Sequence, residues 1–199
     1  MSRSSGSPDQ LAGVSRLLSK VLRHEPELIG VRLDAQGWAD IDNLLLAIGR
    51  AASSPLAGKR LRGLPAVNRQ FLQQVVAEND EGRFAVSSDG TRIRAVQGHS
   101  VRVDLGYAHE QPPKVLFHGT AAASLPSIER QGLVPGSRHA VHLSSARDAA
   151  RAVGARHGRP VVLTVLAGRM QQDGLAFAQA TNGGWLTESV PPKYLKRPR

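Results

Sequence analysis

Two histidines on either side of one short predicted helix are the residues best suited to chemistry. His118 begins the triplet His118-Gly119-Thr120 after an apolar run, and His142 follows beyond the helix. Gly119 allows a ligand to approach the backbone closely, and Thr120 can cap the helix, whose first N–H groups favour a phosphate. No HxxxH or CxxC pattern and no nearby carboxylate completes a metal-ligand set, so the stretch suits a nucleotide better than a metal. The alternative interpretation is two partly buried histidines beside a tight turn.

Arginine is the second chemical feature of the chain. There are 26 basic residues against 16 acidic ones, a formal net charge of +10, and most of the basic residues are arginines. Residues 1–100 hold 13 basic and 10 acidic residues, whereas residues 101–199 hold 13 and 6. The planar guanidinium fork of arginine matches the geometry of a phosphate group. A strongly basic small protein most often binds nucleic acid or another polyanion. A merely soluble basic surface is the alternative.

Three basic side chains occupy distinctive places in the first half of the chain. Apolar residues at helical spacing predict an amphipathic helix over residues 10–24, which puts Arg23 and His24 at its C-terminus. A helix C-terminus favours cations in general, so this position alone has a structural explanation. Arg94 lies near the end of a predicted strand, where an exposed strand arginine is the alternative to a functional one.

The elements around these residues predict three helices followed by a two-stranded ribbon, the order of a winged helix. Asp40 or Asp42 is positioned to cap the second helix. The expected elements after the first helix are a helix over 43–48, a loop over 50–65, a helix over 67–78, and strands at 83–86 and 92–96 joined by an Asp89-Gly90-Thr91 turn.

The second half predicts short strands with two helices, an α+β arrangement. Residues 106–114 contain two prolines and several polar residues, as a linker between lobes does. Ser145 and Asp148 resemble a capping box at the start of an alanine-rich helix. The expected elements are a strand at 115–117, a helix with Leu125 and Ile128 on one face that stops at Gly132, a helix over 145–157, strands at 161–166 and 185–187, and a further candidate strand at 175–178.

The chain as a whole bounds the class of protein. At 199 residues and 41% hydrophobic content it can form one large domain or two small lobes with a real core. It has no cysteine, no apolar run near the length of a membrane span and no signal peptide. We therefore expect a cytoplasmic monomer without membrane attachment, with residues 1–9 as a disordered start.

Short motifs follow one another in a distinctive order from about residue 11 to residue 195. They are Leu22-Arg23-His24, Ile93-Arg94-Ala95 with Gln97-Gly98-His99-Ser100, His118-Gly119-Thr120, Arg138 with Val141-His142-Leu143-Ser144, Asn182-Gly183 with Leu186-Thr187, and Pro192-Lys193-Tyr194. Each motif is weak alone. Together and in order they resemble the RNA 2'-phosphotransferases, the NAD-dependent enzymes that remove the splice-junction 2'-phosphate in tRNA splicing.

The resemblance implies a fold and a reaction. The implied fold is α+β, with a winged-helix lobe over residues 10–105 that binds the RNA phosphate, a linker over 106–114 and an ADP-ribosyltransferase-like lobe over 115–199 that holds NAD. The RNA 2'-phosphate would attack C1'' of the NAD ribose and expel nicotinamide. The ribose 2''-hydroxyl would then attack that phosphate, which gives 2'-hydroxyl RNA and ADP-ribose 1'',2''-cyclic phosphate. The implied partners are NAD as co-substrate and a tRNA-like RNA with a 2'-phosphate, and no metal is needed.

The resemblance also assigns roles to residues. Arg23 and Arg94 would clamp the 2'-phosphate, Arg138 would stabilise charge on the transferring phosphate, and His24 would bind the phosphate and protonate the leaving RNA oxygen. His118 and Thr120 would position the NAD ribose and nicotinamide. The implied cofactor-binding set is His118, Gly119, Thr120, Gly132, Leu133, His142 and Asn182, with Gly132 and Leu133 bordering the adenosine.

Three positions depart from the family's usual pattern. Val96 stands in place of the usual Asn, Ala140 in place of His, and Gly184 in place of a β-branched residue. None removes a proposed catalytic side chain, but Ala140, expected beside Arg138 on a strand, puts the support of that arginine in doubt. Two other readings stay open: an ADP-ribosyltransferase that acts on terminal phosphates of RNA or DNA, and a non-catalytic winged-helix RNA-binding protein.

Overall fold

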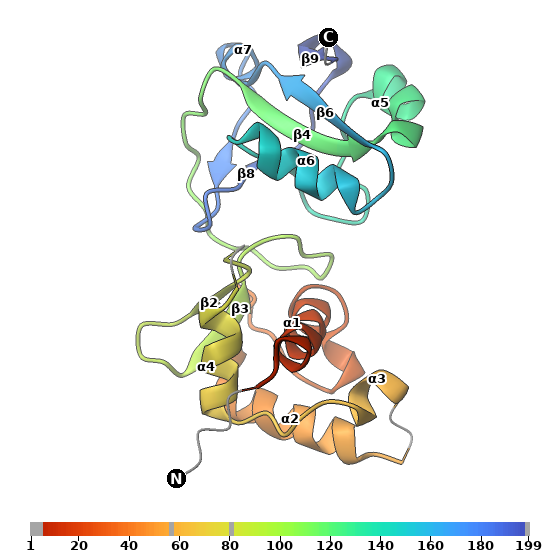
Figure 1. Cartoon of the computed structure of the whole chain (residues 1–199). Helices are drawn as coiled ribbons and strands as arrows, with labels where there is room; N and C mark the ends of the chain where they lie inside the picture. The colour runs from red at the N-terminus through yellow and green to blue at the C-terminus, as the bar shows by residue number, and fades with distance from the viewer. Residues whose placement is uncertain (1–5, 56–57, 80–81, 198–199) are drawn as a thin grey trace. The chain divides into compact units, whose positions relative to one another are not determined.

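The structure, a computed structural model, describes residues 6–55, 58–79 and 82–197. Contacts divide the chain into two units, Met1–Leu105 and Gly106–Arg199. Both contain helices and short antiparallel strands (Figure 1). The α+β class predicted from the sequence is therefore confirmed. Within the described ranges, no helix combines the length and hydrophobicity that a membrane crossing needs.

The first unit packs short helices against a small antiparallel sheet. Its elements are α1 (Pro8–Arg23), η1 (Pro26–Leu28), β1 (Ala39–Asp40), α2 (Ile41–Ser53), α3 (Lys59–Arg62), α4 (Arg69–Ala77), β2 (Phe84–Val86) and β3 (Arg92–Ala95). The strand order is β1-β3-β2, so β3, which carries Arg94, is central. The predicted two-stranded ribbon is thus a three-stranded sheet, because β1 is too short to show a periodicity.

Helix α1 begins earlier than the sequence pattern indicated. The Ser7 side chain accepts a hydrogen bond from the Gln10 backbone N–H, and the Gln10 side chain accepts one from the Ser7 N–H. This reciprocal cap satisfies two N–H groups that would otherwise lack partners. The prediction of a disordered start is therefore wrong for residues 6–9, and residues 1–5 lie outside the described residues.

The predicted loop over residues 50–65 is mostly wrong. Of the two predicted caps, it is Asp40 that caps α2, by accepting from the Asn43 N–H at 2.8 Å. Helix α2 continues to Ser53 because this alanine-rich stretch favours a helix. Ser54 ends it, in the extended conformation preferred before a proline. A further turn of helix, α3, follows, and residues 56–57 lie outside the described part of the chain.

The second unit contains two three-stranded antiparallel sheets. Its elements are β4 (Leu116–Ala121), η2 (Ala122–Ser124), α5 (Leu125–Gln131), β5 (Val141–Leu143), α6 (Arg147–Ala155), β6 (Pro160–Val165), α7 (Ala167–Gln172), β7 (Ala178–Gln179), β8 (Trp185–Thr187), η3 (Pro192–Tyr194) and β9 (Leu195–Lys196). The strand orders are β4-β6-β9 and β5-β8-β7. Phe117 and Ser144 join the two sheets by exchanging backbone hydrogen bonds of 2.8 and 2.9 Å.

Two local predictions in this unit need correction. Helix α6 has Ala146 as its N-cap with no side-chain bond, so Ser145 and Asp148 form no capping box. The candidate strand at 175–178 is displaced to β7, which pairs with β8. Two backbone contacts join the segment 106–114, a predicted linker, to the rest of the second unit: His109 pairs with Ala178, and the Glu110 N–H donates to the Phe177 carbonyl.

Candidate functional site

Arg23 and His24 lie where α1 ends against the segment that follows β3. The Arg23 carbonyl accepts hydrogen bonds from the Ser100 and Val101 N–H groups at 2.8 and 3.2 Å. The His24 ring Nδ1 is 2.9 Å from the Ser100 hydroxyl. Helix α1 thus holds a half-buried guanidinium and an exposed imidazole at its negative end, where positive charge is stabilised.

The Arg23 guanidinium is placed beside the end of β3. Its Nη2 donates to the Arg83 carbonyl oxygen at 3.5 Å, and the Val96 N–H donates to the same oxygen at 2.9 Å. Val96 follows β3 and is 2% exposed. The valine that stands here in place of the usual asparagine is therefore a buried apolar side chain. The shared carbonyl therefore links Arg23 to the strand on which Arg94 lies.

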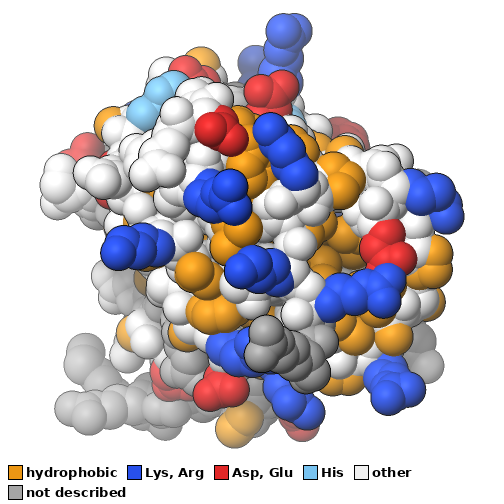
Figure 2. Space-filling model, turned by 90° about the horizontal axis from the view of Figure 1, so that it is seen from above, with side chains coloured by type: hydrophobic (Ala, Val, Ile, Leu, Met, Phe, Trp, Pro, Cys, Tyr) orange, Lys and Arg blue, Asp and Glu red, His pale blue; other side chains and the backbone are white. Residues whose placement is uncertain are grey.

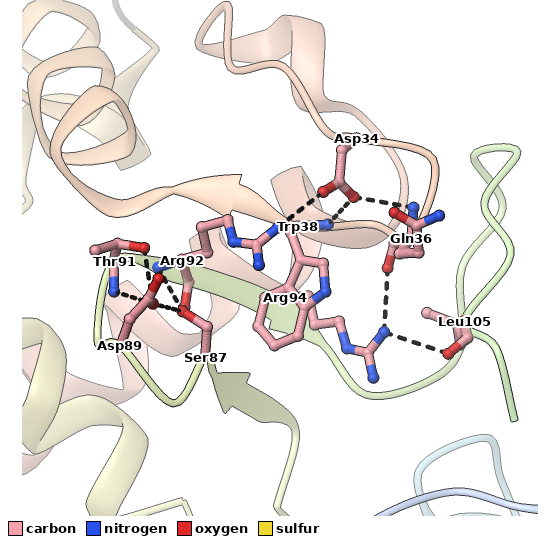
Figure 3. Close-up of polar contacts among 9 residues, drawn as sticks. All are labelled: Asp34, Gln36, Trp38, Ser87, Asp89, Thr91, Arg92, Arg94 and Leu105. Carbon is pink, nitrogen blue, oxygen red and sulfur yellow. Dashed lines mark hydrogen bonds and ion pairs between the residues drawn. The ribbon is translucent and has the colours of Figure 1, made fainter.

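Arg94 is half-buried and held by backbone and aromatic groups. Its Nη1 donates to the carbonyl oxygens of Gln36 and Leu105, each at 3.3 Å, and its Cζ is 4.5 Å from the centre of the Trp38 ring (Figure 3). Sequence reasoning missed the role of Trp38. The available signal was a tryptophan, one of only two, directly after a glycine in a basic chain poor in aromatics.

His118 lies on β4 and contacts the neighbouring sheet. Its ring Nδ1 is 3.0 Å from the backbone carbonyl oxygen of His142 on β5. A carbonyl only accepts, so this contact assigns the proton to Nδ1 and leaves Nε2 as an acceptor. Burial lowers the pKa of His118 below its ordinary value, and the positive charge of Arg138 lowers it further, while the bond to His142 opposes both effects.

We predict that His118 is neutral at pH 7, because its pKa lies below the ordinary value of 6.5. At a pH between the lowered pKa of folded His118 and the ordinary value of 6.5 in the unfolded chain, the unfolded chain binds a proton that the folded chain does not. The contribution of His118 to stability is therefore fully present above pH 6.5 and is lost as the pH drops through that value. Ring-proton NMR titration measures the pKa directly. Arg138→Ala should raise it, because a repelling charge is removed, and an unchanged titration would contradict the proximity of Arg138.

Arg138 lies in a bend rather than on a strand. Its N–H donates to the Pro135 carbonyl at 3.2 Å, its side chain is exposed, and β5 begins only at Val141. The prediction that Arg138 and Ala140 share a strand is therefore wrong, because Pro135 and Gly136 start a turn there. Ala140 is half-buried in the same bend. Arg138 acts on His118 through its positive charge, which lowers the pKa of that histidine.

Gly119 and Thr120 have structural positions that the sequence interpretation did not foresee. A Cβ on Gly119 would lie 1.6 Å from the Ala150 carbonyl oxygen, so the backbone of α6 approaches Gly119 closely. Thr120 is buried within β4, opposite Val161, and caps no helix, since α5 starts at Leu125 after Ser124. Helix–strand packing therefore explains both residues locally.

The remaining cofactor-binding candidates divide into buried and exposed positions. Gly132 ends α5 with φ +79°, and a Cβ there would meet the Val190 carbonyl oxygen at 2.1 Å. Leu133 is 4% exposed and pairs with Val190. His142 is half-buried on β5, and exposed Asn182 accepts from the Gly184 N–H in the turn before β8. Gly132 and Leu133 thus have structural roles, whereas His142 and Asn182 remain accessible.

The two units contribute different candidates. Arg23, His24 and Arg94 belong to the first, whereas Arg138 and all seven cofactor-binding candidates belong to the second. On the face drawn in Figure 2, basic side chains are spread out with apolar side chains between them. The described arrangement therefore places two arginines and a histidine among the candidates of the first unit, and an imidazole with a nearby guanidinium in the second.

Comparison with known proteins gives a consistent result. A family described as RNA 2'-phosphotransferase, Tpt1 / KptA family, matches residues 9–189. The chain is 51% identical over 188 residues to an RNA 2'-phosphotransferase of Escherichia coli strain K12, covering 94% of this chain and 96% of that protein. A probable RNA 2'-phosphotransferase of Shigella boydii serotype 18 shows the same identity and coverage.

Proposed function

Because the chain belongs to the RNA 2'-phosphotransferase, Tpt1 / KptA family, we propose that it removes a 2'-phosphate from RNA by transferring it to NAD. The observation that carries this proposal is the match over residues 9–189, with 51% identity to a curated relative along nearly the whole of both chains. The proposal includes a winged-helix lobe in the first unit and an ADP-ribosyltransferase-like lobe in the second.

The first step joins the two substrates. NAD supplies the anomeric carbon C1'' of its nicotinamide ribose with nicotinamide as the leaving group. A phosphate oxygen of the RNA attacks C1'' while the bond from C1'' to nicotinamide breaks. Arg23 and Arg94 grip the phosphate dianion, which needs strong donors of opposite charge, and their half-burial favours a fixed geometry.

The second step releases the RNA. The ribose 2''-hydroxyl loses its proton to solvent and attacks the phosphorus. The bond from phosphorus to the RNA 2'-oxygen breaks, and that oxygen takes up a proton from His24. Arg138 stabilises the charge on the transferring phosphate, as arginines do in other phosphoryl transfers. The products are 2'-hydroxyl RNA and ADP-ribose 1'',2''-cyclic phosphate.

The residues of the second unit fit the NAD ribose in part. A neutral His118 with Nδ1 bonded to His142 presents Nε2 as an acceptor for a ribose hydroxyl. Lowering of the His118 pKa by burial keeps this acceptor available at neutral pH. Gly119 fits less well as an NAD contact, because α6 occupies the space beside it. We therefore assign the ribose to His118 and leave Gly119 with a packing role.

The test is incubation of the purified protein with NAD and a short RNA that carries one internal 2'-phosphate, followed by gel and mass analysis. We expect a plain 2'-hydroxyl RNA and release of ADP-ribose cyclic phosphate. RNA that stops at the ADP-ribosylated stage would identify a transferase that performs only step one. Bound but unchanged RNA would favour a binding protein and contradict the proposal.

A further inference from the structure

A small framework in the first unit surrounds the Arg94 side chain, and the proposed mechanism does not use it. Arg94 contacts the ring of Trp38 and the carbonyl oxygens of Gln36 and Leu105 (Figure 3). Two of these three partners belong to one loop, residues 34–38. We call this loop the Trp38 loop, and its rigidity decides how firmly the guanidinium is oriented.

Asp34 closes the Trp38 loop on itself. Its carboxylate Oδ1 accepts hydrogen bonds from the backbone N–H groups of Gln36 and Trp38, both at 2.9 Å. The Asp34 N–H donates to the Trp38 carbonyl at 2.9 Å, and the Gly37 N–H donates to the Asp34 carbonyl at 3.0 Å. Side-chain bonds of this kind replace regular secondary structure and fix a turn. The Gln36 carbonyl is therefore held in place for Arg94.

Arg92 fastens the Trp38 loop to β3. It lies two residues before Arg94, on the same face of the strand. Its Nη1 is 3.5 Å from the Asp34 Oδ2, and its Cζ is 5.5 Å from the centre of the Trp38 ring (Figure 3). The Asp104 N–H donates to the Ala35 carbonyl at 2.8 Å, which ties the segment that ends at Leu105 to the same loop. The Gln36 and Leu105 carbonyls that accept from Arg94 thus depend on one framework.

We propose that Trp38 and Asp34 are positioning residues, which orient the Arg94 guanidinium for the RNA 2'-phosphate. This inference rests on the proposed function. Carbonyl oxygens and an aromatic face can orient a guanidinium without supplying a countercharge, so they do not compete with a phosphate dianion as a carboxylate partner would. Asp34 acts indirectly, because its carboxylate accepts from the loop N–H groups and pairs with Arg92.

The test compares the affinities of each variant for RNA with and without one 2'-phosphate, in the absence of NAD. The dissociation constant for plain RNA divided by that for 2'-phosphorylated RNA measures the preference for the phosphate, separately from general RNA binding. We expect Trp38→Leu to lower this ratio about tenfold, because the free energy of a well-formed cation–π contact corresponds to about that change in affinity. Trp38→Phe should retain part of it, because a ring is kept. Affinity for plain RNA should stay unchanged in both.

A double-substitution cycle separates positioning from an independent role. If Trp38 acts through Arg94, Trp38→Leu combined with Arg94→Ala should lose no more of the ratio than Arg94→Ala alone. Arg69→Ala is the control for Arg94→Ala. Arg69 is an exposed arginine of the same unit that donates to the Gly90 carbonyl and the Asp42 carboxylate, and its loss should keep the full ratio. Circular dichroism checks folding, and Asp34→Asn, which should also lower the ratio, replaces Trp38→Leu if that variant does not fold.

The possible results are distinct. An unchanged ratio in folded Trp38→Leu, or losses that multiply in the double variant, would overturn the inference while leaving the proposed function intact. If the unsubstituted protein neither prefers 2'-phosphorylated RNA nor turns it over, the proposed function fails and the inference falls with it.

Discussion

Arg138→Ala is expected to accumulate RNA that carries ADP-ribose on its 2'-phosphate. The grip on the phosphate in step one is assigned to Arg23 and Arg94, which lie in the other unit, so nicotinamide release should continue. Step two passes through a phosphoryl-transfer transition state, where an arginine contributes roughly 10³ to 10⁵ in rate. We therefore expect step two to slow by at least about 10³-fold, with NAD binding kept.

Single-turnover assays with labelled RNA measure both steps in one experiment. The intermediate and the final 2'-hydroxyl RNA differ in mass and in gel mobility, so their rates of formation can be read separately. Arg169→Ala is the control, because Arg169 is an exposed arginine of the same unit, on α7, without a proposed role. Cyclic phosphate formed at the normal rate by Arg138→Ala would refute the assignment, and so would a loss of NAD binding.

Features that depend on neighbours in sequence were predictable. The apolar positions of α1 recur every three or four residues, and the same residues form its buried face. Asp40 caps α2 because its carboxylate needs only the N–H groups of the next turn. The positions of Arg23 and His24 at a helix end, and of Arg94 on a strand, followed from these local patterns.

Features that depend on distant partners were not predictable. The contact between Gly119 and Ala150 requires α6 to lie on β4, and no pattern around residue 119 encodes that helix. The bond between His118 and the His142 carbonyl depends on the pairing of two sheets through Phe117 and Ser144. Strand β1 has two residues, which is below the length at which alternation can be seen.

The misplacement of Arg138 has a related cause. The apolar residues around 141 predict a strand, but Pro135 and Gly136 turn the chain, and pairing with β8 begins only at Val141. A turn gives an arginine more freedom than a strand does, because its backbone is not fixed by ladder bonds. Residue 140 therefore does not support Arg138 as a strand neighbour. We expect the alanine at this position to affect the proposed activity less than the sequence implied.

Gly119→Ala is expected to destabilise the second unit severely. The added methyl carbon would lie 1.6 Å from the Ala150 carbonyl oxygen and 2.5 Å from the carbonyl carbon, so the α6 backbone would have to move. Gly154 makes the matching approach from the helix, with its added carbon 2.8 Å from the Thr120 carbonyl oxygen. Both surfaces are backbone and cannot relax by a rotamer change. We expect a loss of at least about 3 kcal/mol, a large part of a typical domain's stability.

Thermal and urea denaturation measure this loss, and Gly49→Ala is the matched control. Gly49 lies within α2 with nothing within 4 Å of an added Cβ, so the same substitution should gain about 0.5 to 1 kcal/mol by favouring the helix. A glycine kept for ligand approach, as the sequence first indicated, would accept alanine with little change in stability and a large loss of NAD affinity. That pattern would restore Gly119 to the binding site, whereas unfolding would show that helix α6 requires glycine there.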